Sequence, residues 1–108
     1  MAERLNAVVV LVTVPRAAAT RVADALLAPR LAACVSRVDG VRSSYWWRGR
    51  RCRATESLLI AKTRRQLLRK LIAAVRAVHP YEVPEIVALP LVEGNPTYLA
   101  WIRGETGG

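Results

Sequence analysis

Hydrophobic and polar positions change their spacing several times along this chain, and each spacing predicts one element. Residues 5–14, LNAVVVLVTV, are apolar at nearly every position and rich in β-branched side chains, as in a strand that is buried on both faces. After Pro15, which suits the first position of a helix, apolar residues recur at helical spacing. The predicted buried face of this helix consists of Ala18, Val22, Ala25 and Leu26. The Ala-Pro-Arg segment at 28–30 is expected to end it.

The middle of the chain is typical of two long strands joined by a hairpin. The first of them covers residues 31–38, bends or bulges at Asp39-Gly40 and resumes over residues 41–47. The sequence RGRR forms the expected tip, from which residues 52–63 return as a third strand.

A second amphipathic helix is predicted directly after the third strand. Thr63 and Gln66 match a capping box, in which the first side chain caps the helix and the second reaches back. Because Pro80 disfavours helical geometry at the residue before it, the helix is expected to end at His79. Its apolar stripe consists of Leu67, Leu68, Leu71, Ile72, Val75 and Val78.

The last part of the chain predicts one more strand and a short final element. Residues 85–92, EIVALPLV, form the fourth strand, and Pro90 inside it argues for an edge position or a bulge. A turn at 94–96 precedes the final element, whose sequence is TYLAWIR.

The resulting order is β-α-β-β-α-β with a short C-terminal element, which predicts a ferredoxin-like α+β sandwich with an antiparallel sheet. Residues 1–108 are expected to form one domain. Right-handed crossovers place the first and third strands in the centre of the sheet and both helices on one face. The opposite face would be polar in a monomer, but VVVLV and SLLIA offer apolar residues at successive positions. The sequence therefore predicts that another copy of the chain covers this face.

Basic residues outnumber acidic ones in this sequence. The 17 Lys and Arg residues and the 8 Asp and Glu residues give a formal net charge of +9, which invites an anionic partner. The densest run lies at the expected hairpin tip and comprises Arg48, Arg50, Arg51 and Arg53. The other arginines are spread along the chain, which favours an ordinary solvated surface, and both interpretations stay open.

A four-stranded βαββαβ sheet also occurs in RNA-recognition modules. Those modules stack bases on aromatic residues of their two central strands. In this chain Phe is absent, and the two predicted central strands contain no aromatic residue. Nucleic acid is therefore not an expected partner.

The N-terminal region imitates a signal peptide, because the apolar run at 7–12 is followed by alanines at 17–19. Thr13 interrupts the run, however, and cleavage after the alanines would remove the predicted first strand. We therefore interpret this region as part of the mature protein. No apolar run approaches the ~20 residues that span a bilayer. We expect a cytoplasmic protein with no membrane partner.

The two cysteines are expected to be free thiols. The predicted hairpin sets Cys52 opposite Trp46 or Trp47. Cys34 would then lie on the order of 40 Å away along the same strand, whereas a disulfide needs Cα atoms within about 7 Å.

The segment HPYEVPE combines the only histidine, His79, with two prolines and two glutamates. One interpretation is structural: the segment forms a stiff corner between a helix and a strand, where a histidine suits the helix C-terminus. The other interpretation is a metal site, in which His79 binds the metal and Glu82, Glu85 and Cys34 are candidate sources of oxygen or sulfur ligands. Neither H-x₃-H nor C-x₂-C spacing occurs, so both interpretations stay open.

The predicted topology separates two of these candidates. We expect the second and fourth strands to begin at the same end of the sheet but at opposite edges. Cys34 and His79 would then be level yet far apart, and could meet only across a subunit boundary. Catalysis is not expected, because a single histidine leaves no second base and no Ser or Cys is recognisably paired with it.

Three blocks, in order, resemble the CutA family of divalent-cation tolerance proteins over essentially the whole chain. They are LAACVSRVDGVRSSYWWRGR, LLIAKT and HPYEVPEIVALPLVEGNPTYLAWI. The resemblance implies a ferredoxin-like subunit in a very stable homotrimer built like the PII signalling proteins, in which apolar faces turn inward. It implies that the side chains clasping the next subunit include Tyr45, Trp47, Tyr98 and Trp101.

The resemblance also implies a non-enzymatic role in tolerance of divalent cations, copper above all. His79 and Glu85 match the family's H-P-Y-E-x-P-E motif, and Cys34 matches its A-A-C position, so Cu(II) or another divalent metal is the expected ligand. Val12 and Val78 stand where some members carry a Cys and a second His, which weakens the expected copper site. Cys52 and the arginine-rich tip also depart from the family. These departures keep open an alternative function, a binding or signalling scaffold for an anionic partner.

Overall fold

A computed structural model describes residues 6–107 of the chain. A short 3₁₀ turn, η1 (Arg65–Leu67), separates the third strand from the second helix. The other elements, in order, are β1 (Ala7–Val14), α1 (Arg16–Leu27), β2 (Cys34–Trp47), β3 (Arg50–Arg64), α2 (Leu68–Val78), β4 (Ile86–Pro90) and α3 (Pro96–Glu105).

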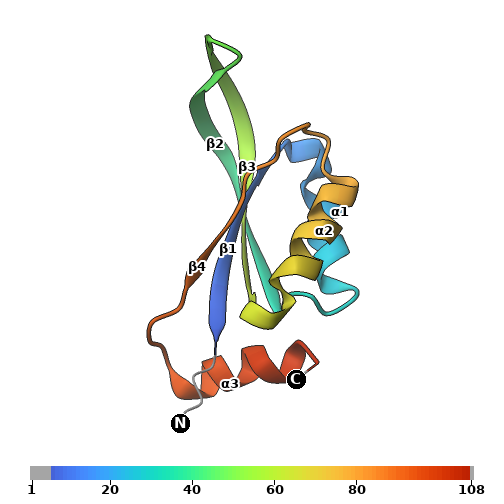
Figure 1. The fold of residues 1–108 in the computed structure, drawn as a ribbon, viewed down its shortest axis with the longest axis vertical. Helices are drawn as coiled ribbons and strands as arrows, with labels where there is room; N and C mark the ends of the chain where they lie inside the picture. The colour runs from blue at the N-terminus through green and yellow to red at the C-terminus, as the bar shows by residue number, and fades with distance from the viewer. Residues whose placement is uncertain (1–5, 108) are drawn as a thin grey trace.

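The sheet has the predicted antiparallel ferredoxin-like topology. Its strand order is β2-β3-β1-β4, with β1 and β3 in the centre and β2 and β4 at the edges. Figure 1 shows α1 and α2 together on one face of the sheet, while α3 lies across the end where β1 begins. The fold class and the placement of all four strands are therefore confirmed.

The core lies between the sheet and the two helices α1 and α2. Alternate residues of β1, namely Val10, Val12 and Val14, are fully buried, because successive side chains of a strand point to opposite faces. They meet Leu26 of α1 and Leu71 of α2, which are also fully buried. Packing of this kind needs one apolar stripe from each helix, as the spacing of apolar residues predicted.

The other face of the sheet is also apolar, and neither α1 nor α2 covers it. Paired residues of neighbouring strands share a face, so the register places Leu11, Ile60 and Val87 side by side on it. We call this the second sheet face; its apolar residues are Val9, Leu11, Val38, Leu58, Ile60, Val87 and Leu89. Val87 and Leu89 are 49% and 53% exposed. The prediction that β1 is apolar on both faces is confirmed.

The hairpin of β2 and β3 projects beyond the rest of the sheet, as Figure 1 shows. β3 pairs with β1 only from Ser57 onward, so residues 50–56 pair with β2 alone. Arg48 and Gly49 form the two-residue turn, both with positive φ, as a tight hairpin requires. We call residues 41–56 the distal hairpin.

The predicted bend at Asp39-Gly40 is confirmed as an irregularity in the β2–β3 ladder between Val38 and Val41. The expected partner of Cys52, Trp46 or Trp47, was wrong by one or two residues: Cys52 pairs with Tyr45, because the turn lies at Arg48-Gly49, nearer the N-terminus than predicted. Cys34 pairs with Lys62 at the far end of β3, about 33 Å from Cys52 at ~3.3 Å per residue, so both cysteines are free.

The predicted capping box at Thr63 was wrong. Strand pairing continues to Arg64, and the Thr63 hydroxyl donates a hydrogen bond to the Leu31 carbonyl oxygen at 2.7 Å. No side chain caps η1 or α2. A threonine that is fully buried in a ladder already has its hydrogen bond, so it cannot also cap the helix that follows.

The C-terminal part also differs from expectation. β4 stops at Pro90, not at Val92, which is 92% exposed. The final element is a helix of ten residues, α3, whose N-terminus is capped by the Asn95 side chain accepting from the Thr97 backbone N–H. Proline at its first position supports the same start. None of the helices that the structure describes is long and apolar enough to cross a membrane.

The bulge carries an acid whose ionised form is favoured by folding. Hydrogen bonds from Ser57 and Arg37, together with the nearby guanidinium charges, lower the pKa of Asp39. The carboxyl therefore binds its proton more weakly in the folded chain than in the unfolded chain. Its contribution to stability is present above about pH 4 and is lost as the pH falls through the lower folded value.

We predict that Asp39→Asn lowers the free energy of unfolding near neutral pH and that the difference from wild type shrinks as the pH falls below about 4. Denaturant titrations at a series of pH values measure this. Asp24→Asn, the same change at an exposed position of α1, serves as the control and should give a small, flat difference. A difference for Asp39→Asn that does not vary with pH would contradict the prediction.

Candidate functional site

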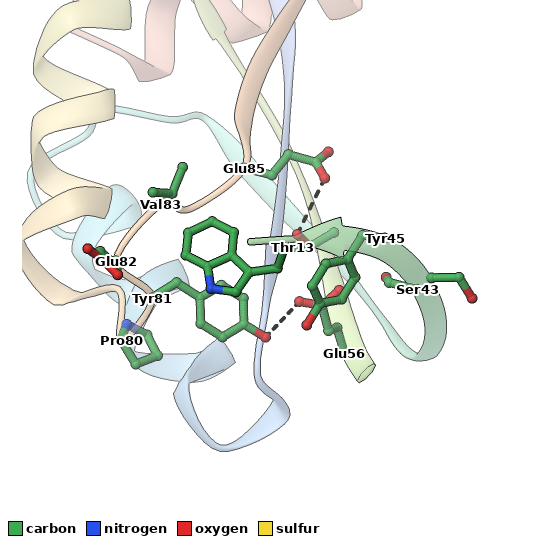
Figure 2. A pocket seen from close by; sticks show the side chains of 11 residues that line it. Thr13, Ser43, Tyr45, Glu56, Pro80, Tyr81, Glu82, Val83 and Glu85 are labelled. Atoms are coloured by element: carbon green, nitrogen blue, oxygen red, sulfur yellow. Dashed lines mark hydrogen bonds between the residues drawn. The ribbon is translucent and has the colours of Figure 1, made fainter. Parts of the chain in front are cut away.

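A pocket of about 680 Å³ lies between the distal hairpin and the segment HPYEVPE at 79–85, which we call the corner. Figure 2 shows its side chains arriving from β1, from the distal hairpin and from the corner. The lining residues are Thr13, Ser43, Ser44, Tyr45, Trp47, Glu56, Pro80, Tyr81, Glu82, Val83 and Glu85.

The corner is fixed to the central strand by His79. α2 ends at Val78, and His79 takes an extended backbone conformation before Pro80, as predicted. Its ring Nε2 donates to the Thr13 carbonyl oxygen at 2.8 Å, and its Nδ1 accepts from the Tyr81 backbone N–H at 3.1 Å. Because a carbonyl can only accept and an N–H can only donate, these two bonds select the neutral Nε2–H tautomer.

Tyr81 and Glu56 connect the corner to the distal hairpin. The Tyr81 hydroxyl donates to Glu56 Oε2 at 2.7 Å, the contact drawn as a dashed line in Figure 2. Burial and the neighbouring Glu56 carboxylate raise the pKa of Tyr81 well above its usual range. The phenol therefore stays protonated and remains a hydrogen-bond donor.

The two acids of the corner, Glu82 and Glu85, contact different partners. Glu85 accepts a long hydrogen bond of 3.4 Å from the Thr13 hydroxyl. Glu82 pairs with Arg48 at 3.0 Å, and the guanidinium of Arg48 also lies 5.2 Å from the centroid of the Trp47 ring. Both groups of the Arg48–Glu82 pair are exposed, so this contact contributes little to stability.

The three metal-ligand candidates are not brought together within one chain. His79 and Glu85 both contact Thr13, near the end of β1, whereas Cys34 is level with Val9 through Lys62. Cys34 is thus about 13 Å along the sheet and about 10 Å across it from Thr13. No group of three His, Cys, Asp or Glu side chains that could hold a metal occurs within residues 6–107.

The expectation that Cys34 and His79 lie level was therefore wrong. β2 runs parallel to β1, and β4 runs antiparallel to both, so β2 and β4 begin at opposite ends of the sheet. The expected separation within one chain is confirmed. Both ring nitrogens of His79 already have backbone partners, so metal binding by His79 would require one of these bonds to break.

The four arginines of the hairpin tip do not share one face. Arg51 and Arg53 pair with Trp46 and Ser44 on one side of the ribbon, and Arg50 points to the other side. Arg48 is engaged with Glu82, whereas the ion pairs found within the described residues do not involve the other three.

The four aromatic candidates form two separate pairs. Tyr45 and Trp47 line the pocket. Tyr98 and Trp101 stack on each other at the other end of the molecule, with ring centroids 5.5 Å apart on α3. All four are between 38% and 44% exposed, and their role in subunit packing stays a prediction.

Sequence reasoning missed Glu56, a buried acid of the pocket lining. It is 5% exposed and lies on the same face of β3 as Leu58 and Ile60. The available signal was a single acid at a position where an alternating strand turns from polar to apolar, in the run ATESLLIA. Tyr81, in the quoted corner motif, was also not assigned a role.

The chain is thus a ferredoxin-like domain with a projecting hairpin and a His-Pro-Tyr-Glu corner. The sequence profile of the CutA1 divalent ion tolerance protein family matches residues 8–105. The chain is similar to the divalent-cation tolerance protein CutA of Thermus thermophilus, with 51% identity over 92% of this chain and 97% of that protein. The chain belongs to the CutA1 family.

Plant relatives and solved structures agree with this assignment. The chloroplastic protein CutA 1 of rice is 47% identical over 92% of this chain, which spans only 56% of the rice protein. The crystal structure of rice CutA1 superposes with a TM-score of 0.89 at 46% identity, covering 93% of each chain. The structure of the Thermus thermophilus protein gives a TM-score of 0.90 at 50% identity, covering 94% of this chain and 99% of that one.

We predict that Tyr81→Phe destabilises the protein, by about 1–3 kcal/mol, because it leaves the buried Glu56 carboxylate without its hydrogen-bond donor. The raised pKa means that the folded state holds the phenol proton more tightly than the unfolded state does. This contribution is therefore present below about pH 10 and is lost as the pH rises further.

Tyrosinate absorbance followed against pH tests this assignment. The wild type should show an ionisation step above the usual tyrosine range, and that step should be missing in Tyr81→Phe. Tyr98→Phe, which changes a tyrosine outside the pocket, is the control and should retain the step. A late step that survives Tyr81→Phe would show that the assignment is wrong.

Proposed function

We propose that this chain forms a homotrimer that acts, without catalysis, in divalent-cation tolerance, and that it binds Cu(II) or another divalent metal where copies meet. The observation that carries the proposal is the second sheet face. It presents seven apolar residues, and in a single chain Val87 and Leu89 remain about half exposed. Apolar patches of this kind are typical of protein interfaces.

Self-assembly also accounts for the aromatic side chains of the distal hairpin and α3. Tyr45, Trp47, Tyr98 and Trp101 are each more than one third exposed. Partly exposed aromatic residues are enriched at interfaces, where they bury a large area. The choice of a trimer follows from membership of the family and from the PII-like assembly that the resemblance implies.

The proposed metal site draws its ligands from more than one copy. Cys34 shares the second sheet face with Ile60, because it pairs with Lys62 at the end of the same ladder. His79 and Glu85 lie at the opposite end of the sheet. A metal would bind Cys34 of one copy and the corner of another, after His79 Nδ1 gives up its bond to the Tyr81 N–H.

A non-enzymatic role fits the chemistry of the described residues. The only histidine holds two backbone groups through its ring, and neither cysteine is among its hydrogen-bond partners. A nucleophile needs a neighbouring base that is free to take its proton.

We place the protein in the cytoplasm, where two free thiols of this kind are stable.

An alternative function is a scaffold for an anionic partner, bound by the hairpin tip. Arg50, Arg51 and Arg53 are exposed, and guanidinium groups bind phosphate and carboxylate groups well. Against this, the three do not share a face, and Arg48 is paired with Glu82. Binding that weakens steeply with salt and ignores metal would favour this alternative.

We predict that Leu89→Glu disrupts the trimer, because it buries a charge in the second sheet face. Sedimentation equilibrium should give three subunits for the wild type and a smaller species for this variant. Leu27→Glu is the control. Leu27 is 40% exposed, but it lies at the end of α1 in the helical layer, away from the second sheet face. The Leu27→Glu variant should therefore assemble as the wild type does. A monomeric wild type would overturn the proposal.

We predict that the purified protein binds Cu²⁺ with micromolar affinity, and that binding is lost in both Cys34→Ser and His79→Ala. Calorimetric titration in a non-chelating buffer measures this. Cys52→Ser, which removes the other free thiol, is the control and should bind as the wild type does. Copper binding that is unchanged in His79→Ala would show that the corner has only a structural role. No copper binding at all would refute the metal proposal.

A further inference from the structure

The pocket differs in composition from the rest of the protein. Its lining combines three acidic and three aromatic side chains: Glu56, Glu82, Glu85, Tyr45, Trp47 and Tyr81. These are three of only eight acidic residues in the sequence, and the lining contains none of the 17 Lys and Arg residues. A strongly basic chain thus places acids and aromatic rings together at one site.

Glu56 is the most buried acid of the pocket and is incompletely paired. Only 5% of it is exposed, and its Oε2 accepts from the Tyr81 hydroxyl at 2.7 Å. Within residues 6–107 no Lys, Arg or His forms an ion pair with it, and its Oε1 has no hydrogen-bond partner. Oε1 is not sealed inside the protein, because no fully enclosed side-chain oxygen in the described part of the chain lacks a partner. A buried carboxylate of this kind favours a cation in the pocket.

The other two acids differ in their availability. Glu82 is neutralised by Arg48 at 3.0 Å. Glu85 contacts the Thr13 hydroxyl at 3.4 Å, and Figure 2 shows its carboxylate at the rim of the group. Glu56 and Glu85 therefore supply the negative charge that a ligand would meet.

The walls favour an organic cation over a bare metal ion. Aromatic faces attract cations, alkylated ammonium groups in particular, and Tyr45, Trp47 and Tyr81 provide three such rings. A divalent metal needs several ligand atoms at once, and the described residues form no such group. A volume of about 680 Å³ suits a ligand of metabolite size.

We propose that the pocket binds a small organic amine in its protonated form, with the ammonium group against Glu56 and the alkyl part against Tyr45 and Trp47. The hydroxyl groups of Thr13 and Ser43 supply further acceptors for its N–H groups. This inference does not rest on metal binding. Thr13, Glu56 and Glu85 adjoin the second sheet face, so a neighbouring copy would border the site.

Matched probes that differ mainly in charge test the proposal. n-Butylammonium, 1,4-diaminobutane, n-butanol and butyrate are titrated into the full chain near neutral pH, followed by calorimetry and by saturation-transfer NMR. We expect both amines to bind, and n-butanol and butyrate to bind at least tenfold more weakly. Equal binding of amine and alcohol, or no binding of either amine, would overturn the proposal.

Three Glu→Gln variants, each of which removes one negative charge, test where the amine binds. Glu56→Gln keeps an acceptor for Tyr81 but removes the charge, and should weaken amine binding at least tenfold. Glu93→Gln makes the same change at an exposed residue outside the pocket and should leave binding unchanged. Glu85→Gln provides a second test that does not disturb a buried side chain, and should weaken binding severalfold. Equal effects of all three changes would refute the proposed site.

Cu²⁺ serves as a competing probe. We expect it to weaken amine binding no more than Glu85→Gln does, since Glu85 is the one candidate metal ligand that lines the pocket, whereas His79 and Cys34 do not. Copper binding that depends on Glu56, in the absence of amine binding, would make this a metal site and overturn the inference.

Discussion

Strand β1 is hydrogen-bonded on both sides and apolar on both faces, so burial of these two faces is the main constraint on the fold. α1 and α2 cover one face, where Val10, Val12 and Val14 are fully buried. Within residues 6–107 the remaining α-helix, α3, lies across the end of the sheet (Figure 1). Burial of the second sheet face would need a surface from outside the described residues, such as the second copy of the chain proposed above.

The polar end of that same face borders the pocket. Along β1, Val9 and Leu11 are followed by Thr13, and along β3 the apolar residues Ile60 and Leu58 are preceded by Glu56. The face thus changes from apolar to acidic where the distal hairpin leaves the sheet. His79 holds the corner against this end through the Thr13 carbonyl, so the corner closes the pocket and also anchors α2 to the central strand.

The fold was predictable because its signals are local and agree with one another. The β-branched run of β1, the apolar stripes of α1 and α2, and the Asp39-Gly40 irregularity each predicted the correct element. Errors arose where two signals competed for one residue. Thr63 suits a helix cap and also a strand, and ladder pairing with β1 decided the outcome. The prediction that Cys34 and His79 lie at the same end of the sheet was wrong because it depends on the direction of each strand. Strand direction follows from the full set of strand pairings, and not from the order of elements alone.

The site was less predictable than the fold, because its residues are far apart in the sequence. Thr13, Glu56 and Tyr81 come from β1, β3 and the corner, and only the folded chain brings them together. The histidine that looked most like a ligand holds two backbone groups in place, whereas an acid that looked like an ordinary strand residue is buried with one oxygen unpaired. A titratable side chain is available to a ligand only to the extent that the protein leaves its hydrogen bonds unmade.

The net charge of +9 is compatible with the proposed cation site. At physiological ionic strength, charges more than about 8 Å apart in solvent are largely screened. The lining of the pocket itself carries carboxylates and lacks basic side chains. Arg48, which pairs with Glu82 of the lining, has its charge offset by that carboxylate. A chain can thus have both a basic surface that attracts a large anionic partner and an acidic pocket that attracts a small cation. The large partner interacts with charges spread over the surface, whereas the small cation interacts mainly with the charges of the pocket lining.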